Sequence, residues 1–298
     1  MNDELEFTGE RFTPECVREI RYEHFHRYAF ARDLAGGKKV LDAACGEGYG
    51  SALLAASAVS VTGIDRSEES IAHARGRYQA PNLDFQAADC LDLPFGADSF
   101  DCIVSFETLE HLADHDGLLR EFRRVLRPDG FLLLSSPDKA VYSDTLQNRN
   151  EFHVRELYRH ELESLLQAHF PAFRLWGQRL LFHSALWSQE SASGVRCLQD
   201  RDGEVQGSGA PAHEPVYFIA LCAADEGSLP KVGHGLNLFD DADESIYRHY
   251  HHEIRKNMAV GEILAARDRE IAELRATLEA RKAEPPQTPW WRRLLGRR

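Results

Sequence analysis

Two glutamates and a histidine in the stretch FETLEHLADH could do chemistry together. On a helix, Glu107, Glu110 and His111 stand at positions i, i+3 and i+4, so their side chains would share one face. His111 could act as a general base with Glu110 beside it, because an imidazole is the commonest base. The three could also bind a divalent metal, with His153 in NEFHVREL either as a fourth ligand or as a contact to the substrate. Oxygen-rich ligation favours Mg²⁺ or Mn²⁺ over zinc. A third alternative is purely local, with the glutamates capping or pairing within their own turn.

These three side chains would suit a hydroxyl acceptor. An aliphatic hydroxyl is far too weak an acid to ionise near neutral pH. It needs a positioned base, or a metal that lowers its pKa, before it can attack. The Glu/Glu/His face could supply either form of activation.

A glycine-rich turn lies upstream, in VLDAACGEGYGSALLA, where a predicted strand leads into a predicted helix. Its glycines, Gly46, Gly48 and Gly50, form a G-x-G-x-G pattern. A dinucleotide fingerprint requires G-x-G-x-x-G, and the place of its last glycine is taken by Ser51. The turn therefore predicts a nucleotide-like cofactor but argues against a dinucleotide.

Three acids at the ends of successive predicted strands narrow the choice of cofactor. Asp42 precedes the turn, where it would repel a diphosphate and attract a cationic amino-acid moiety. Asp65 ends the next strand, where an acid accepts hydrogen bonds from ribose hydroxyls. Asp89 follows the third strand and could accept from an adenine amino group. Three acids without a phosphate-binding Lys or Arg suit S-adenosylmethionine, which has a positive charge and no phosphate.

The elements that must position these residues alternate regularly. Short apolar strands and helices follow one another over residues 38–136, which predicts right-handed βαβ units and a mostly parallel sheet with helices on both faces. A helix is expected over residues 153–170. Two later strands, at 173–180 and 214–223, would close the sheet as an antiparallel hairpin, with a long loop at 188–214 between them. The expected fold class is α/β and Rossmann-like, with seven strands.

The ordered motifs VLDAACGEGYG, GID, ADCLDLPF, FDCIVSFETLEHL and LRPDGFLLLSSP resemble those of the class I methyltransferases. The resemblance implies that Asp42, Gly46 and Gly48 border the methionine end of S-adenosylmethionine, that Asp65 holds the ribose, and that Asp89 and Cys90 frame the adenine. Cys45 and Arg66 are expected in the same site. Phe106 would lie near the methyl group. The E-x-x-E-H pattern also resembles that of small-RNA 2′-O-methyltransferases and ubiquinone-pathway O-methyltransferases, whose counterparts hold a divalent metal.

The N-terminal segment, with ERFTP and EHFHRY, together with NEFHV, resembles bacterial methyltransferases of surface-polysaccharide (O-antigen, lipopolysaccharide) biosynthesis. This resemblance implies that the acceptor is a sugar hydroxyl of a glycan, or of its sugar-nucleotide or lipid-linked precursor. A structural clamp is the simpler alternative for Glu10, Arg11 and Phe12. Two rival functions remain open. One is methylation of a small phenolic or quinone-like metabolite, which predicts a mostly apolar acceptor pocket. The other is a non-catalytic coiled-coil scaffold in a membrane assembly.

The C-terminal part predicts a second kind of structure. Residues 242–283 are helical by composition, and their second half carries a heptad seam of Leu264, Ile271, Leu274 and Leu278. A coiled-coil stalk that makes a homo-oligomer is expected, with a single amphipathic helix as the alternative. The tail WWRRLLGRR suits an anionic membrane surface, or is simply a basic tail. The expected division is a lid at 1–37, a methyltransferase domain at 38–224, a linker at 225–241, the stalk, and the tail at 284–298.

Composition limits the partners and the location. The net charge of −13 argues against a nucleic-acid partner, because such proteins usually present a basic face. The six cysteines form no C-x-x-C pair, no apolar run approaches the roughly 18 residues of a membrane helix, and the acidic N-terminus has no signal-peptide pattern. A cytoplasmic protein is expected, with peripheral contact to the inner face of the cytoplasmic membrane.

Overall fold

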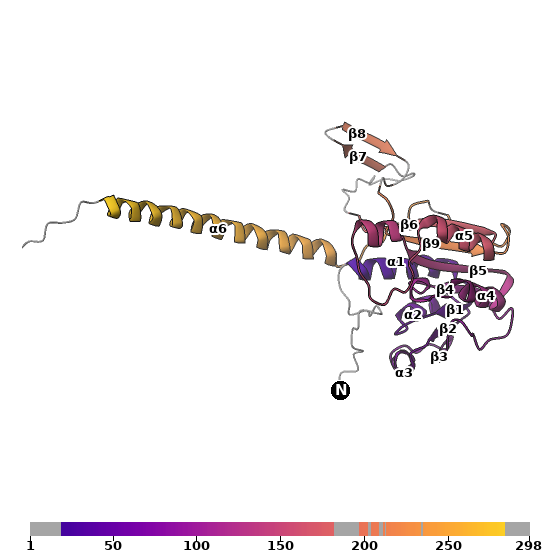
Figure 1. Cartoon of the computed structure of the whole chain (residues 1–298). Helices are drawn as coiled ribbons and strands as arrows, with labels where there is room; N and C mark the ends of the chain where they lie inside the picture. The colour runs from indigo at the N-terminus through magenta and orange to yellow at the C-terminus, as the bar shows by residue number, and fades with distance from the viewer. Residues whose placement is uncertain are drawn as a thin grey trace, which may run out of the picture. The chain divides into compact units, whose positions relative to one another are not determined.

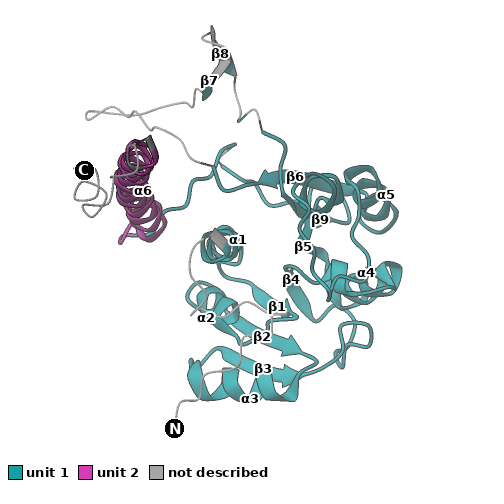
Figure 2. Cartoon of the chain, turned by 60° about the vertical axis from the view of Figure 1, so that its left-hand side comes forward, with its two compact units in different colours: residues 1–241 teal, residues 242–298 magenta. Residues whose placement is uncertain are grey.

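The computed structural model describes residues 19–181, 197–201, 204–208, 211, 213–233 and 235–283. The chain divides into two compact units, residues 1–241 and 242–298 (Figure 2). The segment expected as a linker, 225–241, is part of the first unit. Within that unit, Phe239 packs edge-on against Tyr22, with ring centroids 5.6 Å apart. The expected lid lies in part, and the expected tail entirely, outside the described residues.

The first unit is built on a seven-stranded sheet (Figure 1), in the order β3-β2-β1-β4-β5-β9-β6. The parallel strands are β1 (Lys39–Ala43), β2 (Ser60–Asp65), β3 (Leu83–Ala87), β4 (Phe100–Ser105) and β5 (Leu126–Pro137). β9 (Tyr217–Ala223) runs antiparallel between β5 and β6 (Ala172–Gln178). The predicted fold class is confirmed, including the closing antiparallel pair.

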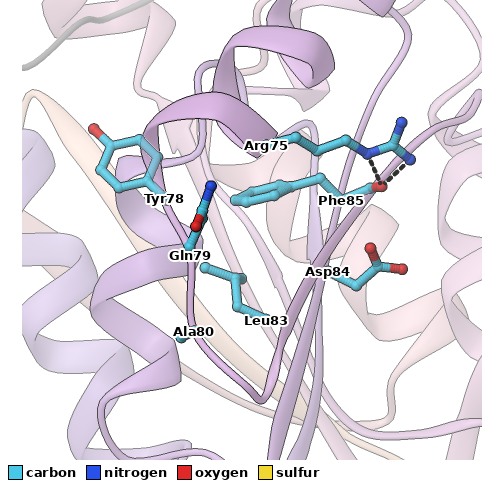
Figure 3. A pocket seen from close by; sticks show the side chains of 7 residues that line it. All are labelled: Arg75, Tyr78, Gln79, Ala80, Leu83, Asp84 and Phe85. Carbon is cyan, nitrogen blue, oxygen red and sulfur yellow. Dashed lines mark hydrogen bonds between the residues drawn. The ribbon is translucent and has the colours of Figure 1, made fainter.

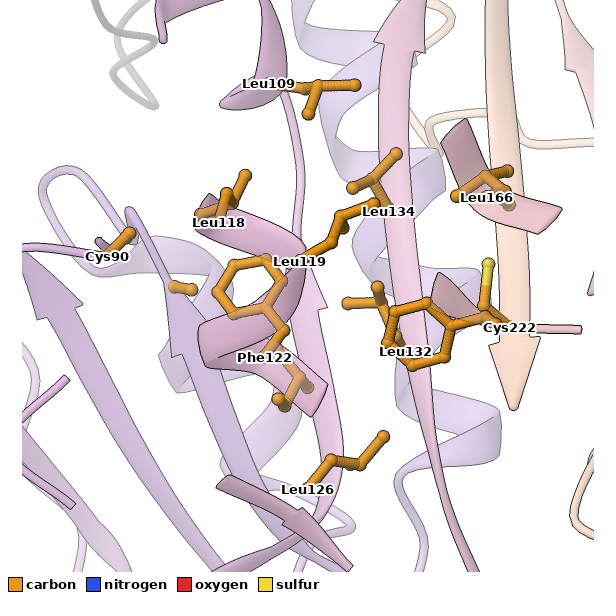
Figure 4. Packing of buried hydrophobic residues seen from close by; sticks show 14 of the residues in the cluster. Cys90, Leu109, Leu118, Leu119, Phe122, Leu126, Leu132, Leu134, Leu166 and Cys222 are labelled. Carbon is orange, nitrogen blue, oxygen red and sulfur yellow. The ribbon is translucent and has the colours of Figure 1, made fainter. Parts of the chain in front are cut away.

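Helices cover both faces of the sheet (Figure 2). One face carries α1 (Glu19–Leu34), α2 (Tyr49–Ala55) and α3 (Glu68–Arg77), and the other carries α4 (His115–Val125) and α5 (Arg159–His169). The strands are apolar on both faces because both are covered. In β1, Val40 packs with α1 and α2, while the next residue, Leu41, packs with α4 and α5. Figure 4 shows Leu118, Leu119 and Phe122 of α4 in this second core.

The helix predicted over ETLEHLAD is not formed. Only a single 3₁₀ turn, η1 (Leu109–His111), is present, because Glu107 adopts a left-handed backbone with φ of 51° that no right-handed helix can include. The prediction that Glu107 shares a helical face with Glu110 and His111 was therefore wrong. The helix expected from residue 153 begins only at Arg159, and a π-helical turn, η2 (Ala140–Thr145), precedes it.

Part of the segment expected as a loop at 188–214 forms a small sheet of its own. Strands β7 (Cys197–Arg201) and β8 (Glu204–Ser208) pair with each other in antiparallel fashion. They contribute no strand to the seven-stranded sheet, so the pairing of β6 with β9 is unaffected.

The second unit contains one long helix, α6 (Ser245–Ala283). Apolar side chains along it are exposed, including Val260, Leu264, Ile271, Leu274 and Leu278. None of the helices in the described part of the chain has the length and apolar character required to cross a bilayer.

Candidate active site

The glycine-rich turn between β1 and α2 uses its glycines for different purposes. Gly46 has φ of 56°, and a Cβ built on it would meet nothing within 4 Å. Gly48 has φ of 93°, but a Cβ there would lie 2.8 Å from both Ala74 and Phe85. Gly46 therefore leaves open space for a ligand, whereas Gly48 allows α3 and β3 to pack closely under the turn. Gly50 serves packing as well, because its Cβ would overlap the Tyr28 ring.

Asp65, at the end of β2, is fixed beside this turn. Its Oδ2 accepts a hydrogen bond from the Gly46 backbone N–H at 3.1 Å, and its Oδ1 accepts one from the Ser67 N–H at 2.8 Å. The carboxylate is half-buried. An acid held in this way at the end of the second strand suits a ribose diol, as the sequence predicted.

Asp42 is fully buried behind the turn. Its carboxylate accepts hydrogen bonds from the Ser51 hydroxyl at 2.6 Å and the Tyr28 hydroxyl at 3.1 Å. Burial raises the pKa of Asp42 to about 7, although these two hydrogen bonds oppose the shift. Ser51 stands where a dinucleotide fingerprint would have its last glycine, and its hydroxyl is a hydrogen-bond donor to the buried carboxylate of Asp42.

The remaining residues predicted for the cofactor lie around the same strand ends. Asp89 is exposed and accepts a hydrogen bond from the Leu91 N–H at 2.8 Å, whereas the neighbouring Cys90 is buried. Cys45 is also buried, and its N–H donates to the Ile64 carbonyl at 2.8 Å. Arg66 is exposed. The buried Cys45 and Cys90 therefore pack beneath the site, whereas the exposed Arg66 and Asp89 are positions that a ligand could reach.

Sequence reasoning missed an acid inside the turn itself. Glu47 is almost fully buried, and its carboxylate accepts a hydrogen bond from the Tyr78 hydroxyl at 2.8 Å and lies 3.0 Å from His73 Nε2. Both partners come from the α3 region, so Glu47 ties the turn to that helix. Nothing in the local sequence distinguishes Glu47 from an ordinary surface residue, because its partners lie 26 and 31 positions away.

Aromatic side chains connect the turn to the end of β4. Phe106 packs edge-on against Tyr28 with centroids 5.1 Å apart, and Tyr28 packs against Tyr49 at 5.2 Å. Phe25, one of the aromatic residues of the N-terminal motif, stacks on Tyr49. Phe106 is therefore joined through Tyr28 to Asp42, and it leads directly into Glu107.

Glu107 is fixed at the end of β4 by groups that the sequence did not associate with it. Its Oε1 accepts a hydrogen bond from the Ser135 hydroxyl at 2.7 Å and lies 3.3 Å from Nη1 of Arg27. Arg27 is buried, its Nε donates to Gln178 at 2.7 Å, and its guanidinium lies over the Tyr217 ring. Neither terminal nitrogen of Arg27 has a hydrogen-bond partner within the described ranges.

Glu110, His111 and His153 are brought together, as the sequence predicted in part. One ligating atom from each lies within 4.8 Å of the others, and Glu107 is not in this group. Glu110 is buried; this burial, followed by the charge of Glu107, raises its pKa well above the usual value. Nδ1 of His111 is 3.0 Å from the Phe152 carbonyl oxygen. The arrangement can orient a base, stabilise a proton or hold a cation.

A surface hollow of about 180 Å³ lies elsewhere, between the end of α3 and the start of β3 (Figure 3). Arg75 is one of the residues that line it, and it donates to the Phe85 carbonyl oxygen from Nε at 3.0 Å and from Nη2 at 2.5 Å. None of the predicted cofactor or catalytic residues lines this hollow.

This arrangement of sheet, turn and strand-end acids defines a class I methyltransferase, and the comparisons agree. A methyltransferase-domain family matches residues 41–134. A probable S-adenosylmethionine-dependent methyltransferase of Mycobacterium tuberculosis is 33% identical over 244 residues, covering 80% of this chain and 87% of its own. One from Mycolicibacterium smegmatis is 37% identical over 184 residues, covering 61% and 70%. The chain belongs to the S-adenosylmethionine-dependent methyltransferases.

The structure of the YcgJ protein of Bacillus subtilis aligns with this chain with a TM-score of 0.49 and 20% identity, over 68% of this chain and all of its own.

The cofactor is S-adenosylmethionine, and the residues of the site fit it. Gly46 leaves space at the turn, and Asp65 presents a fixed acceptor for hydroxyls.

Proposed function

We propose that the protein transfers a methyl group to a sugar hydroxyl of a bacterial surface glycan or of its precursor. The observation that carries the proposal is a cluster of polar and charged side chains at the ends of β4 and β5. Glu107, Glu110, His111 and Arg27 gather there, next to Phe106 and its aromatic link to the cofactor turn. A hydroxyl acceptor needs such groups, whereas an apolar acceptor would leave them unsatisfied.

The chemistry assigns different tasks to these residues. S-adenosylmethionine supplies an electrophilic methyl group, so the protein must orient the hydroxyl and accept its proton. With the Phe152 carbonyl accepting from Nδ1–H of His111, the lone pair of that ring is on Nε2, which makes Nε2 the base. The raised pKa of Glu110 favours its protonated form, so this carboxyl can exchange a proton with the His111 ring. Transfer then depends mostly on in-line positioning.

Aromatic side chains favour a sugar among hydroxyl acceptors. The Tyr142 and Tyr217 rings lie with centroids 5.8 Å apart, and Tyr142 stacks on His153. Both tyrosines are half-buried. Aromatic faces next to hydrogen-bonding groups suit a sugar, which combines apolar C–H faces with hydroxyls. The resemblance of EHFHRY and NEFHV to polysaccharide methyltransferases supports the same acceptor.

Two rivals account for less of the site. One relative, named phthiotriol/phenolphthiotriol dimycocerosates methyltransferase, of Mycobacterium tuberculosis, is 38% identical over 109 residues, which cover 36% of this chain and 40% of its own. A lipid or small phenolic acceptor predicts an apolar lining, in contrast to the charged groups around Glu107. A non-catalytic scaffold would not require the ordered hydrogen bonds of Asp65 at an open turn.

The test is methyl transfer from isotopically labelled S-adenosylmethionine to three separate acceptor sets. These are surface polysaccharide with its lipid-linked precursors, total apolar lipids, and small phenols. Label in a sugar methyl ether, abolished by His111→Ala with cofactor affinity retained, is the expected result. His169→Ala is the matched control, because His169 also contacts a carboxylate, Asp116, at 2.8 Å but lies on α5. Label only in lipids or phenols would overturn the glycan assignment.

Self-association through α6 belongs to the same proposal. Leu264, Ile271, Leu274 and Leu278 are exposed at heptad spacing, and a second copy would cover them. Association would bring the WWRRLLGRR tails together at one end. Several weak basic tails could then bind an anionic membrane that one tail alone would not hold. Such contact would place the enzyme near a lipid-linked acceptor.

A further inference from the structure

Two imidazoles and one carboxylate meet at the acceptor end of the site. Glu110 and His111 come from η1, and His153 comes from the segment between η2 and α5. Their ligating atoms lie within 4.8 Å of one another, and the two imidazole rings are perpendicular with centroids 5.1 Å apart. This set keeps three of the four ligands expected from sequence, Glu110, His111 and His153, and leaves out Glu107.

Both histidines are oriented through Nδ1. His111 Nδ1 is 3.0 Å from the carbonyl oxygen of Phe152, and His153 Nδ1 is 2.6 Å from Oε1 of Glu156. An Nδ1–H that donates to oxygen fixes the tautomer with its lone pair on Nε2. Metal-binding histidines nearly always show this pattern, with the other ring nitrogen donating to a carboxylate or a backbone carbonyl.

The acceptor of His153 is itself held in place. Glu156 receives a hydrogen bond from the Ser143 hydroxyl through its second oxygen, Oε2. Tyr142 stacks on the His153 ring at 5.4 Å between centroids. Ser143, Glu156 and Tyr142 therefore restrict the His153 ring to one orientation, which a histidine on an ordinary surface would not need.

Glu110 provides an independent indication of a missing partner. The residue is only 1% exposed, and neither carboxylate oxygen accepts a hydrogen bond within the described part of the chain. Burying a carboxylate without a partner is costly, and a bound cation removes that cost. Its backbone carbonyl accepts from Val154 and Arg155, so the chain on both sides of the cluster is fixed around it.

We propose that Glu110, His111 and His153 bind one divalent first-row transition-metal ion, and that Glu156 positions His153 for this role. Two imidazoles and one carboxylate suit Zn²⁺, Fe²⁺ or Co²⁺, whereas Mg²⁺ prefers a site made mostly of oxygen ligands. Three protein ligands leave coordination positions for water or for an acceptor hydroxyl.

The role of the metal rests on the proposed function. A hydroxyl bound to the ion would have a lowered pKa and would release its proton to solvent water before it accepts the methyl group. In the metal-bound protein, Nε2 of His111 is a ligand and no longer the base. The metal site itself is independent of the identity of the acceptor.

The test is titration of the metal-free full-length protein with Co²⁺, followed by visible absorption and by calorimetry. His249 and His252 on α6 are spaced i, i+3 and could bind metal separately. The parent protein therefore carries His249→Ala and His252→Ala. One equivalent of Co²⁺ is expected, displaced by Zn²⁺ but not by millimolar Mg²⁺. His111→Ala and His153→Ala should each weaken binding at least about 100-fold, and Glu156→Gln about 10-fold.

A matched control separates this site from the alternatives. His169→Ala should leave the affinity unchanged, because His169 contacts Asp116 from α5 and lies outside the ligand group. Equal Co²⁺ binding by the parent, His153→Ala and Glu156→Gln would overturn the proposal, as would displacement by Mg²⁺. Methyl transfer is measured in parallel on the same samples. Transfer to sugar without metal binding removes only the metal site, and metal binding without transfer to sugar removes only the acceptor assignment.

Discussion

The carboxylate of Asp65 accepts a hydrogen bond from the backbone N–H of Gly46, at 3.1 Å, which joins the end of β2 to the glycine-rich turn after β1. The contact fixes the carboxylate beside the open side of Gly46, where a Cβ would meet nothing within 4 Å. The acid is thus oriented before any ligand arrives, so its loss should affect binding more than folding.

We expect Asp65→Ala to weaken S-adenosylmethionine binding by about 1.5–3 kcal/mol, the usual value for hydrogen bonds to a charged group. Isothermal calorimetry measures the change, and NAD should not bind to either protein. Asp84→Ala is the control, since Asp84 is an exposed acid on the neighbouring strand β3. Equal affinities for the Asp65 variant and the parent would contradict the ribose assignment.

Gly46 and Gly48 should respond differently to the same substitution. Gly48→Ala places a Cβ 2.8 Å from Ala74 and Phe85 at φ of 93°, and should cost about 2–4 kcal/mol of unfolding free energy. Gly46→Ala meets no protein atom, so it should cost only about 1–2 kcal/mol from its left-handed backbone while weakening cofactor binding. Chemical denaturation and calorimetry on both variants measure the two effects. Similar stability losses with similar affinities would refute this division.

Asp42 should make stability depend on pH. Its pKa is about 7 in the folded protein, above the ordinary value of 3.8, mainly because of burial. Between pH 4 and pH 7 the folded state keeps a proton that the unfolded state releases, so this group's contribution to stability falls as pH rises. Asp42→Asn removes that dependence.

The measurement for Asp42 is urea denaturation of cofactor-free protein at pH 5, 6, 7 and 8. Relative to the parent, Asp42→Asn should gain stability with rising pH, by an amount on the order of a few kcal/mol over this range. The stability of Asp84→Asn, a change at an exposed position, should vary with pH in the same way as that of the parent. A parallel curve for Asp42→Asn would show that Asp42 does not titrate in this range.

The Arg27–Glu107 pair should behave as a coupled unit. Arg27→Met leaves the Glu107 carboxylate without its cation, 3.3 Å away in the parent, and should cost about 3–5 kcal/mol of unfolding free energy. Adding Glu107→Gln should restore part of that loss, because the unpaired charge is removed. A double-mutant cycle by urea denaturation gives the coupling energy. Additive losses would mean that the two side chains do not interact energetically.

Deletion of residues 242–298 should convert an oligomer into a monomer while leaving cofactor affinity unchanged. Leu264→Lys with Ile271→Lys should have the same effect, because both side chains are exposed along the proposed seam. Ala276→Lys, on the opposite side of the heptad, is the control. Sedimentation velocity measures the mass of each. A full-length protein that is already monomeric would remove the proposed self-association of α6.

Local sequence determined much of this protein. Strand and helix periodicity predicted the parallel sheet and its closing antiparallel pair. The acids Asp42, Asp65 and Asp89 predicted the cofactor, because strand ends in a parallel sheet gather at one edge and residue spacing alone places acids there. Composition likewise predicted a long C-terminal helix, which is α6.

Tertiary structure decided which residues come together at the site proposed for the methyl acceptor. Spacing placed Glu107 on a face with Glu110 and His111, but the left-handed backbone at Glu107 turns it toward Ser135 and Arg27, 28 residues later and 80 residues earlier in the chain. His153, which the sequence offered as a fourth ligand, does lie with Glu110 and His111, although it is 43 positions away from Glu110 in the chain. Contacts over such separations depend on how the sheet brings distant segments together, and helical periodicity contains no information about them. Whether Glu107 is one of the ligands beside the two histidines therefore could not be decided before the fold was known.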